Sequence, residues 1–270
     1  MNHTGRRIAL ALLTPCLLAA SALSAQEKTP PEEIVRRSRL TFFYAGEDMK
    51  AKVRMRLVNP QGKERVRAMT MLRKDQQEGG EQKYFIYFHQ PADVRDMTFM
   101  VWKYPGKDDD RWLYIPALKL VRRIAANDSR SSFVGSDFTY EDISGRDPEE
   151  DTYTLVREEA LNGRACDVVR SAPKSERSAD YSYKLAWFDR MSHLPLKEEY
   201  YDRRGDLARV FTAEEVKEVQ GLPTVTKRTM KNLQSGHRTE VTFEEIKYNL
   251  GLSDDLFTER YLRSAPPEAR

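Results

Sequence analysis

The chain contains few cysteines and histidines. Only two of its 270 residues are cysteine, Cys16 and Cys166, and only four are histidine. Cys16 lies in an N-terminal apolar stretch that we expect to be removed, so Cys166 is left with no partner for an internal disulfide. The histidines are isolated, and no spacing of histidine and cysteine matches a zinc site. We therefore expect no metal, no cofactor, and a fold stabilised by its hydrophobic core.

Motifs of the common catalytic sites are also missing. The sequence has no Gly-x-Ser-x-Gly elbow and no glycine-rich phosphate loop. Ser136 stands beside Asp137, but a catalytic triad also needs a base, and no histidine lies close in sequence. The acidic runs at 108–110 and 149–151 offer paired carboxylates of the glycosidase kind, but acids beside turns are more typical of solvated loops. We expect no enzymatic activity.

The chain has no large excess of basic residues. Its 45 Lys and Arg stand against 42 Asp and Glu, and loss of Arg6 and Arg7 with the N-terminal segment leaves 43 against 42, a net charge of +1. Nucleic-acid binding needs a clustered basic excess, so we expect no nucleic-acid partner. No second long apolar run follows residue 25, so we expect the processed chain to be soluble.

The N-terminus has the three parts of a secretory signal peptide. Arg6 and Arg7 precede an apolar run over 8–22, and small residues follow up to Ala25. The apolar run is shorter than the ~20 residues of a transmembrane helix, which argues against a retained anchor. Pro15 directly before Cys16 argues against a lipoprotein cysteine. The sequence predicts a signal peptide over residues 1–25 and export of the remaining chain.

Most of the exported chain has the period of β-strands. After one helix, predicted to open at 29–32 and end before Gly46, residues 50–57 alternate apolar and basic side chains. The runs 84–88 and 97–102 are apolar on both faces, which indicates central strands covered on both sides or facing an apolar cavity. Further short strands with turns between them predict a mainly β barrel or sandwich in one domain over 26–262. We expect a flexible tail at 263–270.

Aromatic residues gather in the middle of the chain. Each one alone is typical of ordinary core packing. Together they indicate a sheet with more apolar surface than its own chain covers, which favours a ligand or a partner. The group comprises Trp102, Trp112, Tyr114, Phe133, Phe138, Tyr140, Tyr183 and Trp187.

Two segments resemble a known family. They are Asp109–Ile124 (DDRWLYIPALKLVRRI) and Gly135–Ile143 (GSDFTYEDI), and Phe88–Arg95 fits the same pattern. The chain resembles the outer-membrane lipoprotein-sorting proteins related to LolA, from about Glu32 to Leu262. The resemblance implies an α+β fold, mainly β: an incomplete antiparallel β-barrel of the LolA/LolB type with helices covering its open face.

The same resemblance implies a function in the periplasm. Such a protein carries the acyl chains of lipids or lipoproteins toward the outer membrane without catalysis. Members of this branch occur beside RND-type (MMPL-like) exporters, which implies an inner-membrane transporter as donor and an outer-membrane acceptor. We expect a monomer. The alternative is a periplasmic lipid sensor of the RseB type that regulates a membrane-bound partner, and an adhesin or purely structural module is a third reading.

The resemblance leads to a predicted binding site. Lipid-binding residues are predicted on one cavity wall: Trp102, Trp112, Tyr114, Phe133, Phe138 and Tyr140. Phe99 and Val101 are expected on the opposite face or beneath the helices, and 129–134 is expected to be a gate. A polar rim is predicted from Arg122, Arg123, Asp137 and Glu141, in which the two acids pair with the two arginines or form a network that fixes the loop.

Overall fold

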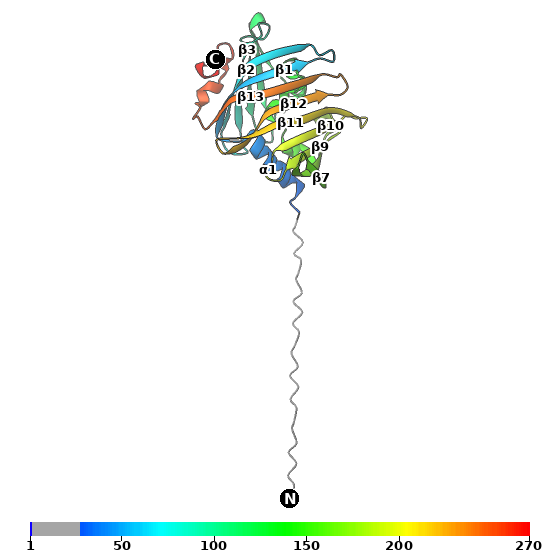
Figure 1. Cartoon of the computed structure of the whole chain (residues 1–270). Helices are drawn as coiled ribbons and strands as arrows, with labels where there is room; N and C mark the ends of the chain where they lie inside the picture. The colour runs from blue at the N-terminus through cyan, green and yellow to red at the C-terminus, as the bar shows by residue number, and fades with distance from the viewer. Residues whose placement is uncertain (2–27) are drawn as a thin grey trace.

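The described chain folds into one curved antiparallel sheet (Figure 1). The computed structural model describes Met1 and residues 28–270, so the predicted signal peptide lies outside the described residues apart from Met1. The strands are β1 (Asp48–Val58), β2 (Glu64–Asp75), β3 (Gln82–Gln90), β4 (Thr98–Lys103), β5 (Asp110–Ile115), β6 (Leu120–Arg123), β7 (Asp151–Leu161), β8 (Arg164–Pro173), β9 (Tyr183–Asp189), β10 (Pro195–Tyr201), β11 (Leu207–Val219), β12 (Leu222–Asn232) and β13 (Arg238–Tyr248).

The sheet consists of two meanders. Strands β1 to β6 pair in sequence order, β7 to β13 do the same, and the pair β1–β13 joins the two halves. Strands β6 and β7 remain as the two edges, so the 13-stranded sheet does not close into a barrel. This arrangement confirms the predicted incomplete antiparallel β-barrel.

Two segments cover the inner face of the curved sheet. One is α1 (Pro31–Phe43), which contacts β7, β9 and β12. The other is the crossover segment, residues 124–150, which leads from edge strand β6 to edge strand β7 and contains the short helix α2 (Tyr140–Ser144). Residues of this segment share one hydrophobic cluster with inner-face residues of both meanders. Covering of the open face by helical segments is therefore confirmed.

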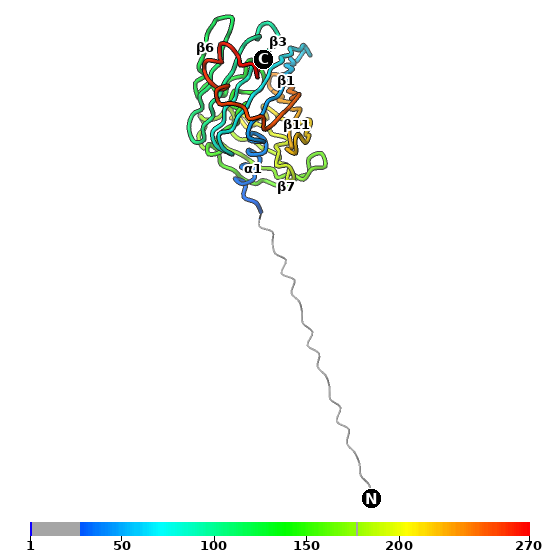
Figure 2. Tube along the Cα trace, turned by 90° about the vertical axis from the view of Figure 1, so that its left-hand side faces the viewer, coloured from blue at the N-terminus to red at the C-terminus, as the bar shows by residue number. Residues whose placement is uncertain are grey.

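The outer face of β2–β5 is covered by the end of the chain. The C-terminal segment, residues 249–270, crosses these strands and lies toward the viewer in Figure 2. Asp48 accepts hydrogen bonds from the backbone N–H groups of Leu250 (2.6 Å) and Leu252 (2.7 Å), and Thr98 Oγ1 donates to the carbonyl of Leu262 (2.6 Å).

We expected a flexible tail at 263–270, but the structure shows residues of this segment packed against the sheet. Ala265 and Ala269 are buried in the outer-face cluster, because small side chains fit between the short helical turns and the sheet. Residues 263–270 therefore pack against the sheet. Within Met1 and residues 28–270, no helix has the length and apolar character that crossing a bilayer requires.

Candidate functional site

A pocket of about 120 Å³ lies between α1, the crossover segment and the inner face of the sheet. Its lining mixes apolar and charged side chains, among them Phe42, Phe138, Phe211, Met230, Glu141, Lys184, Arg209 and Arg228. Engineered cavities of ~150 Å³ hold a molecule the size of benzene, and pockets for larger ligands reach ~300–1,000 Å³. In the closed arrangement this interior is too small for an acyl chain, so such a ligand requires movement of the covering segments.

The inner face beneath those segments is rich in methionine. Most of the chain's nine methionines lie in the inner-face cluster, namely Met49, Met55, Met69, Met71, Met97 and Met230. Methionine is flexible and polarisable and fills irregular spaces, so a surface built from it repacks around different partners. Sequence reasoning concentrated on aromatic residues and missed this signal, although the methionines are visible in the sequence.

Three of the predicted lipid-binding residues lie in the interior. Phe133, Phe138 and Tyr140 belong to the crossover segment and are buried in the inner-face cluster. The ring centroid of Phe133 lies 5.3 Å from that of Phe99 and 5.5 Å from that of Tyr140. Of the three, Phe138 lines the pocket, while Phe133 and Tyr140 fill the space between the crossover segment and β4.

The other three lie on the opposite face of the sheet. Trp102, Trp112 and Tyr114 pack beneath the C-terminal segment, with 5.2 Å between the two indole centroids. Trp102 Nε1 donates a hydrogen bond to the carbonyl of Phe257 (2.8 Å). The six predicted lipid-binding residues therefore do not share one cavity wall as expected. Side chains alternate between the two faces along β4 and β5, and this alternation turns Trp102, Trp112 and Tyr114 away from the interior. Phe99 and Val101, expected on the opposite face or beneath the helices, are inner-face residues beneath the covering segments.

The predicted polar rim does not form as expected. Arg122 pairs with Asp128 (3.5 Å) and Arg123 with Asp110, and both arginine side chains are exposed. Asp137 accepts a hydrogen bond from Thr239 Oγ1 (2.7 Å), and Glu141 pairs with Arg146 (3.3 Å). The predicted pairing of these acids with Arg122 and Arg123 is therefore wrong, because β6 points its arginines to solvent. The alternative, that the acids fix the loop, agrees with these contacts.

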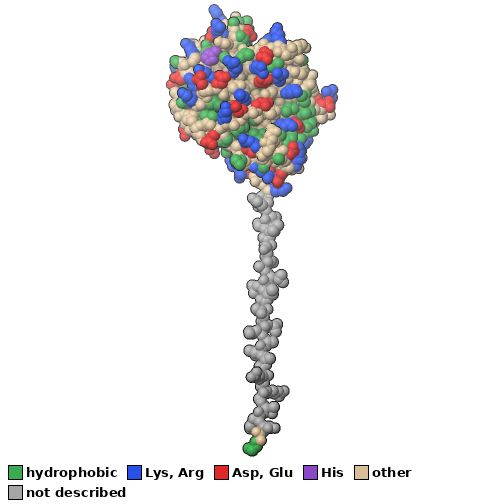
Figure 3. Space-filling model, in the orientation of Figure 1, with side chains coloured by type: hydrophobic (Ala, Val, Ile, Leu, Met, Phe, Trp, Pro, Cys, Tyr) green, Lys and Arg blue, Asp and Glu red, His purple; other side chains and the backbone are tan. Residues whose placement is uncertain are grey.

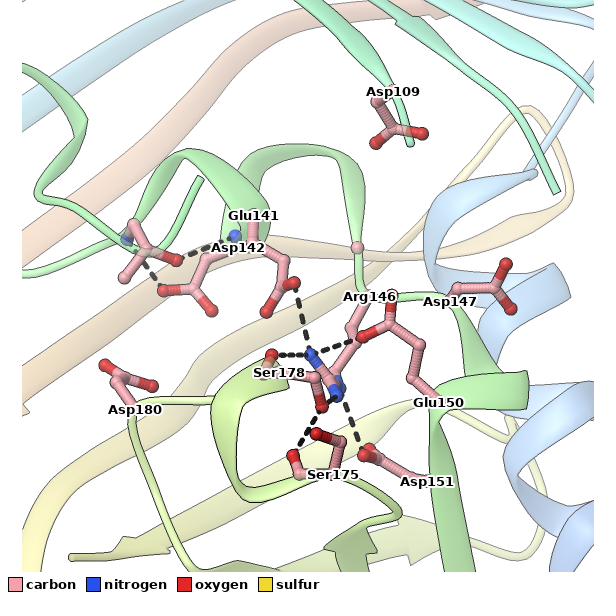
Figure 4. A network of polar contacts seen from close by, with 12 residues as sticks. Asp109, Glu141, Asp142, Arg146, Asp147, Glu150, Asp151, Ser175, Ser178 and Asp180 are labelled. Carbon is pink, nitrogen blue, oxygen red and sulfur yellow. Dashed lines mark hydrogen bonds and ion pairs between the residues drawn. The ribbon is translucent and has the colours of Figure 1, made fainter. Parts of the chain in front are cut away.

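A cluster around Arg146 fixes the end of the crossover segment (Figure 4). The Arg146 guanidinium pairs with Glu150 (2.7 Å) and Asp151 (3.0 Å) as well as Glu141, and donates to the carbonyl of Ser178 (2.5 Å). Burial raises the pKa of Glu141 to about 7, against the opposing effect of Arg146. Four members of this network lie within residues 141–151, but the sequence does not show that they converge on Arg146, and Ser178 joins them from 32 residues away.

The end of α1 is held by polar contacts of the same kind. Arg73 on β2 donates to the carbonyls of Phe43 (2.6 Å), Ala45 (2.5 Å) and Gly46 (2.7 Å), and Gln82 on β3 also donates to the carbonyl of Phe43 (2.8 Å). Both covering segments are thus attached to the sheet through specific hydrogen bonds at their ends, and through apolar packing along their length.

The two covering segments also meet each other. Gly145, at the end of α2, has φ +80°, and a Cβ atom there would lie 2.9 Å from the Phe43 ring of α1. Lys103 Nζ donates to the carbonyl of the same glycine (2.6 Å). Glycine is required here both by its backbone conformation and by the close approach of Phe43.

An open antiparallel half-barrel with a covered inner face defines the LolA-like class of folds. A crystal structure from Vibrio parahaemolyticus, described as an outer membrane lipoprotein-sorting protein domain, is 30% identical, covers 86% of this chain and 98% of its own, and has a TM-score of 0.79. A DUF1329 family protein from Desulfovibrio piger is 29% identical, covers 87% and 100%, and has the same TM-score. The chain belongs to this family of outer membrane lipoprotein-sorting proteins.

A further structural comparison shows the same fold. A LolA superfamily protein from Nitrosomonas europaea is 20% identical, covers 87% of this chain and 100% of its own, and shares the fold with a TM-score of 0.68. A family model described as "Uncharacterized protein" matches residues 80–264. Among curated proteins, no sequence matches this chain.

Proposed function

We propose that this protein is a periplasmic carrier that binds the acyl chains of a lipid or lipoprotein against the inner face of its half-barrel and transfers them toward the outer membrane. The family assignment supports this proposal at the level of the class. The observation that carries the proposal further is the methionine-rich inner face beneath the two covering segments.

The physical need for such a carrier follows from hydration. Each CH₂ group of an acyl chain costs ~0.8 kcal/mol in water, so a free lipid crosses an aqueous compartment too slowly. A curved apolar face shields the chain during transfer, and it requires neither catalysis nor a cofactor. In the closed arrangement Phe133 and Phe138 occupy the space that a chain would take, which keeps the apolar inner face of the sheet covered.

The donor and acceptor complete the proposal. We propose that the cargo comes from an RND-type transporter of the inner membrane and passes to an outer-membrane acceptor, with the carrier acting as a monomer. Charges of both signs are interspersed on the face seen in Figure 3, as in a freely diffusing protein. The sensor alternative stays open, and co-purification of a membrane-bound regulator in place of a transporter would support it.

A matched pair of methionine variants tests the binding site. Met69→Gln places an amide on the inner face, whereas Met100→Gln places the same amide on the outer face beneath the C-terminal segment; both side chains are buried. Both substitutions cost folding stability because they bury a polar group. We expect only Met69→Gln to weaken binding of a fluorescent fatty acid, by about fivefold or more.

The control for this experiment is the wild-type protein isolated from periplasm. Native mass spectrometry followed by lipid extraction should show co-purified acyl lipid. Equal loss of fatty-acid affinity in the two variants, or the absence of both probe binding and extractable lipid in the wild type, would contradict the carrier function.

A further inference from the structure

Arg228 of β12 lies in the interior, where the covering segments meet the sheet. The residue is 9% exposed and lines the pocket described above as well as a smaller one of about 60 Å³ beside it. Its guanidinium carbon lies 5.6 Å from the ring centroid of Phe42 on α1, 5.3 Å from that of Phe138 on the crossover segment, and 4.8 Å from that of Phe243 on β13.

This guanidinium has no hydrogen-bond or ion-pair partner among the described residues. Its Nε is buried without a partner, and no contact of its terminal nitrogens reaches another described polar group. The other buried arginines differ: Arg67 donates to the carbonyl of Val134, Arg73 donates to carbonyls at the end of α1, and Arg111 pairs with Asp109 (2.6 Å). Arg228 is therefore the exception among the buried arginines of the described chain.

The charge persists despite its burial. Desolvation lowers the pKa of Arg228 to about 10, so the side chain remains protonated at neutral pH. Aromatic rings stabilise a cation through their faces, but they do not satisfy its five N–H donors. A buried charge without a partner opposes folding strongly, and an apolar side chain of similar volume is usually more favourable at such a position.

The acids near Arg228 are already engaged elsewhere. Asp142 accepts the backbone N–H of Thr139 (2.8 Å) and pairs with Arg209 (3.4 Å), and Glu141 belongs to the Arg146 cluster. Glu198, which lines the same pocket, pairs with Lys184 (2.7 Å). Among the described residues, the interior therefore presents Arg228 as a cation whose hydrogen-bonding capacity is unused, and it stands among apolar rings.

We propose that Arg228 binds the oxyanion headgroup of an amphiphilic cargo, a carboxylate or phosphate at the end of an apolar chain. This inference rests on the proposed carrier function and names the chemical class of its cargo. The guanidinium fork matches two oxygens of a carboxylate or phosphate. The surrounding rings of Phe42, Phe138 and Phe243, together with Met230 two residues further along β12, form an apolar environment that favours an attached chain over a free inorganic anion.

Binding of palmitate, hexadecyl phosphate, hexadecanol and inorganic phosphate to the purified full-length mature protein tests this proposal. We expect the two anionic amphiphiles to bind the wild type at least about tenfold more tightly than hexadecanol. Arg228→Met should abolish this preference and leave hexadecanol affinity unchanged. The control Arg54→Met removes an exposed arginine from the outer side of β1 and should retain the preference.

Two further measurements guard against a folding artefact. The melting temperature of Arg228→Met without ligand should equal or exceed that of the wild type, because the substitution removes an unpaired buried charge. Arg228→Gln, which keeps a polar side chain without the charge, should lose the same preference for anions.

The outcomes separate this inference from the carrier function. Retention of the anion preference in Arg228→Met and Arg228→Gln would overturn the role of Arg228. If the wild type bound inorganic phosphate as tightly as hexadecyl phosphate, the inference that the cargo is an amphiphile with an apolar chain would be wrong. Equal wild-type affinity for palmitate and hexadecanol would refute the headgroup site alone, whereas no binding of any amphiphile would refute the carrier function itself.

Discussion

Glu141 combines burial with an ion pair in one side chain. Its carboxylate lies 3.3 Å from Arg146, yet burial raises its pKa from the usual value near 4.5 to about 7. The folded protein therefore holds this proton more tightly than the unfolded chain does. As a result, the free energy of unfolding falls as the pH rises from about 4.5 to about 7, because the carboxylate must ionise in a buried site.

We predict that Glu141→Gln flattens this pH dependence. The wild type should lose roughly 1–2 kcal/mol of stability between about pH 5 and pH 7 through this residue, and the variant should not. Asp75, whose pKa burial raises to about 6, acts with the same sign and remains in both proteins. Urea denaturation across this pH range is the measurement, with Glu149→Gln, an exposed neighbour, as control. If the free energy of unfolding fell equally with pH in the wild type and in Glu141→Gln, Glu141 would not be the source of this pH dependence.

At this scale the sequence determines the alternation of side chains but not which side is inside. Phe99 and Trp102 lie on opposite faces of β4, because the period of a strand is two. Both faces of β4 are apolar, so nothing local distinguishes them. The outer face is dry only because residues 249–270, far along the chain, return to cover it. Arg228 was missed for a similar reason, since its missing partner is a property of the folded interior.

At the scale of elements, the C-terminal segment is a structural component of the domain. Phe257 is fully buried against the outer face, and its carbonyl accepts the hydrogen bond from Trp102. We predict that Phe257→Ala lowers the free energy of unfolding by ~3–5 kcal/mol, through lost burial and the cavity it leaves. Leu250→Ala in the same segment should change it by less than ~0.5 kcal/mol, because Leu250 is exposed. Denaturant unfolding followed by tryptophan fluorescence measures both.

The elements themselves were largely predictable, and their connections were not. Residues 50–57 alternate in sequence, and β1 buries Val53 and Met55 while Arg54 points outward. In contrast, no local pattern indicates that the chain passes from one edge of the sheet to the other after β6. That passage places the crossover segment over the inner face, and it explains why Phe133 is covered although it belongs to a connecting segment.

At the scale of the whole molecule, the covering segments and the proposed cargo compete for one space. The apparent affinity of a carrier for its cargo is its intrinsic affinity multiplied by the fraction of molecules that are open. Phe133, fully buried against Phe99 and Tyr140, stabilises the closed arrangement. Removal of its ring weakens contacts that exist only when the crossover segment is in place, so the open fraction rises.

We therefore predict that Phe133→Ala lowers the free energy of unfolding by ~3 kcal/mol and raises the apparent affinity for a fluorescent fatty acid by about tenfold. Phe257→Ala is the matched control: this ring is equally buried but lies on the outer face, so its loss should destabilise the protein without tightening binding. Unchanged affinity in Phe133→Ala would mean that the crossover segment does not cover the site. A loss of affinity would instead return Phe133 to the role first predicted for it, a side chain that touches the bound acyl chain.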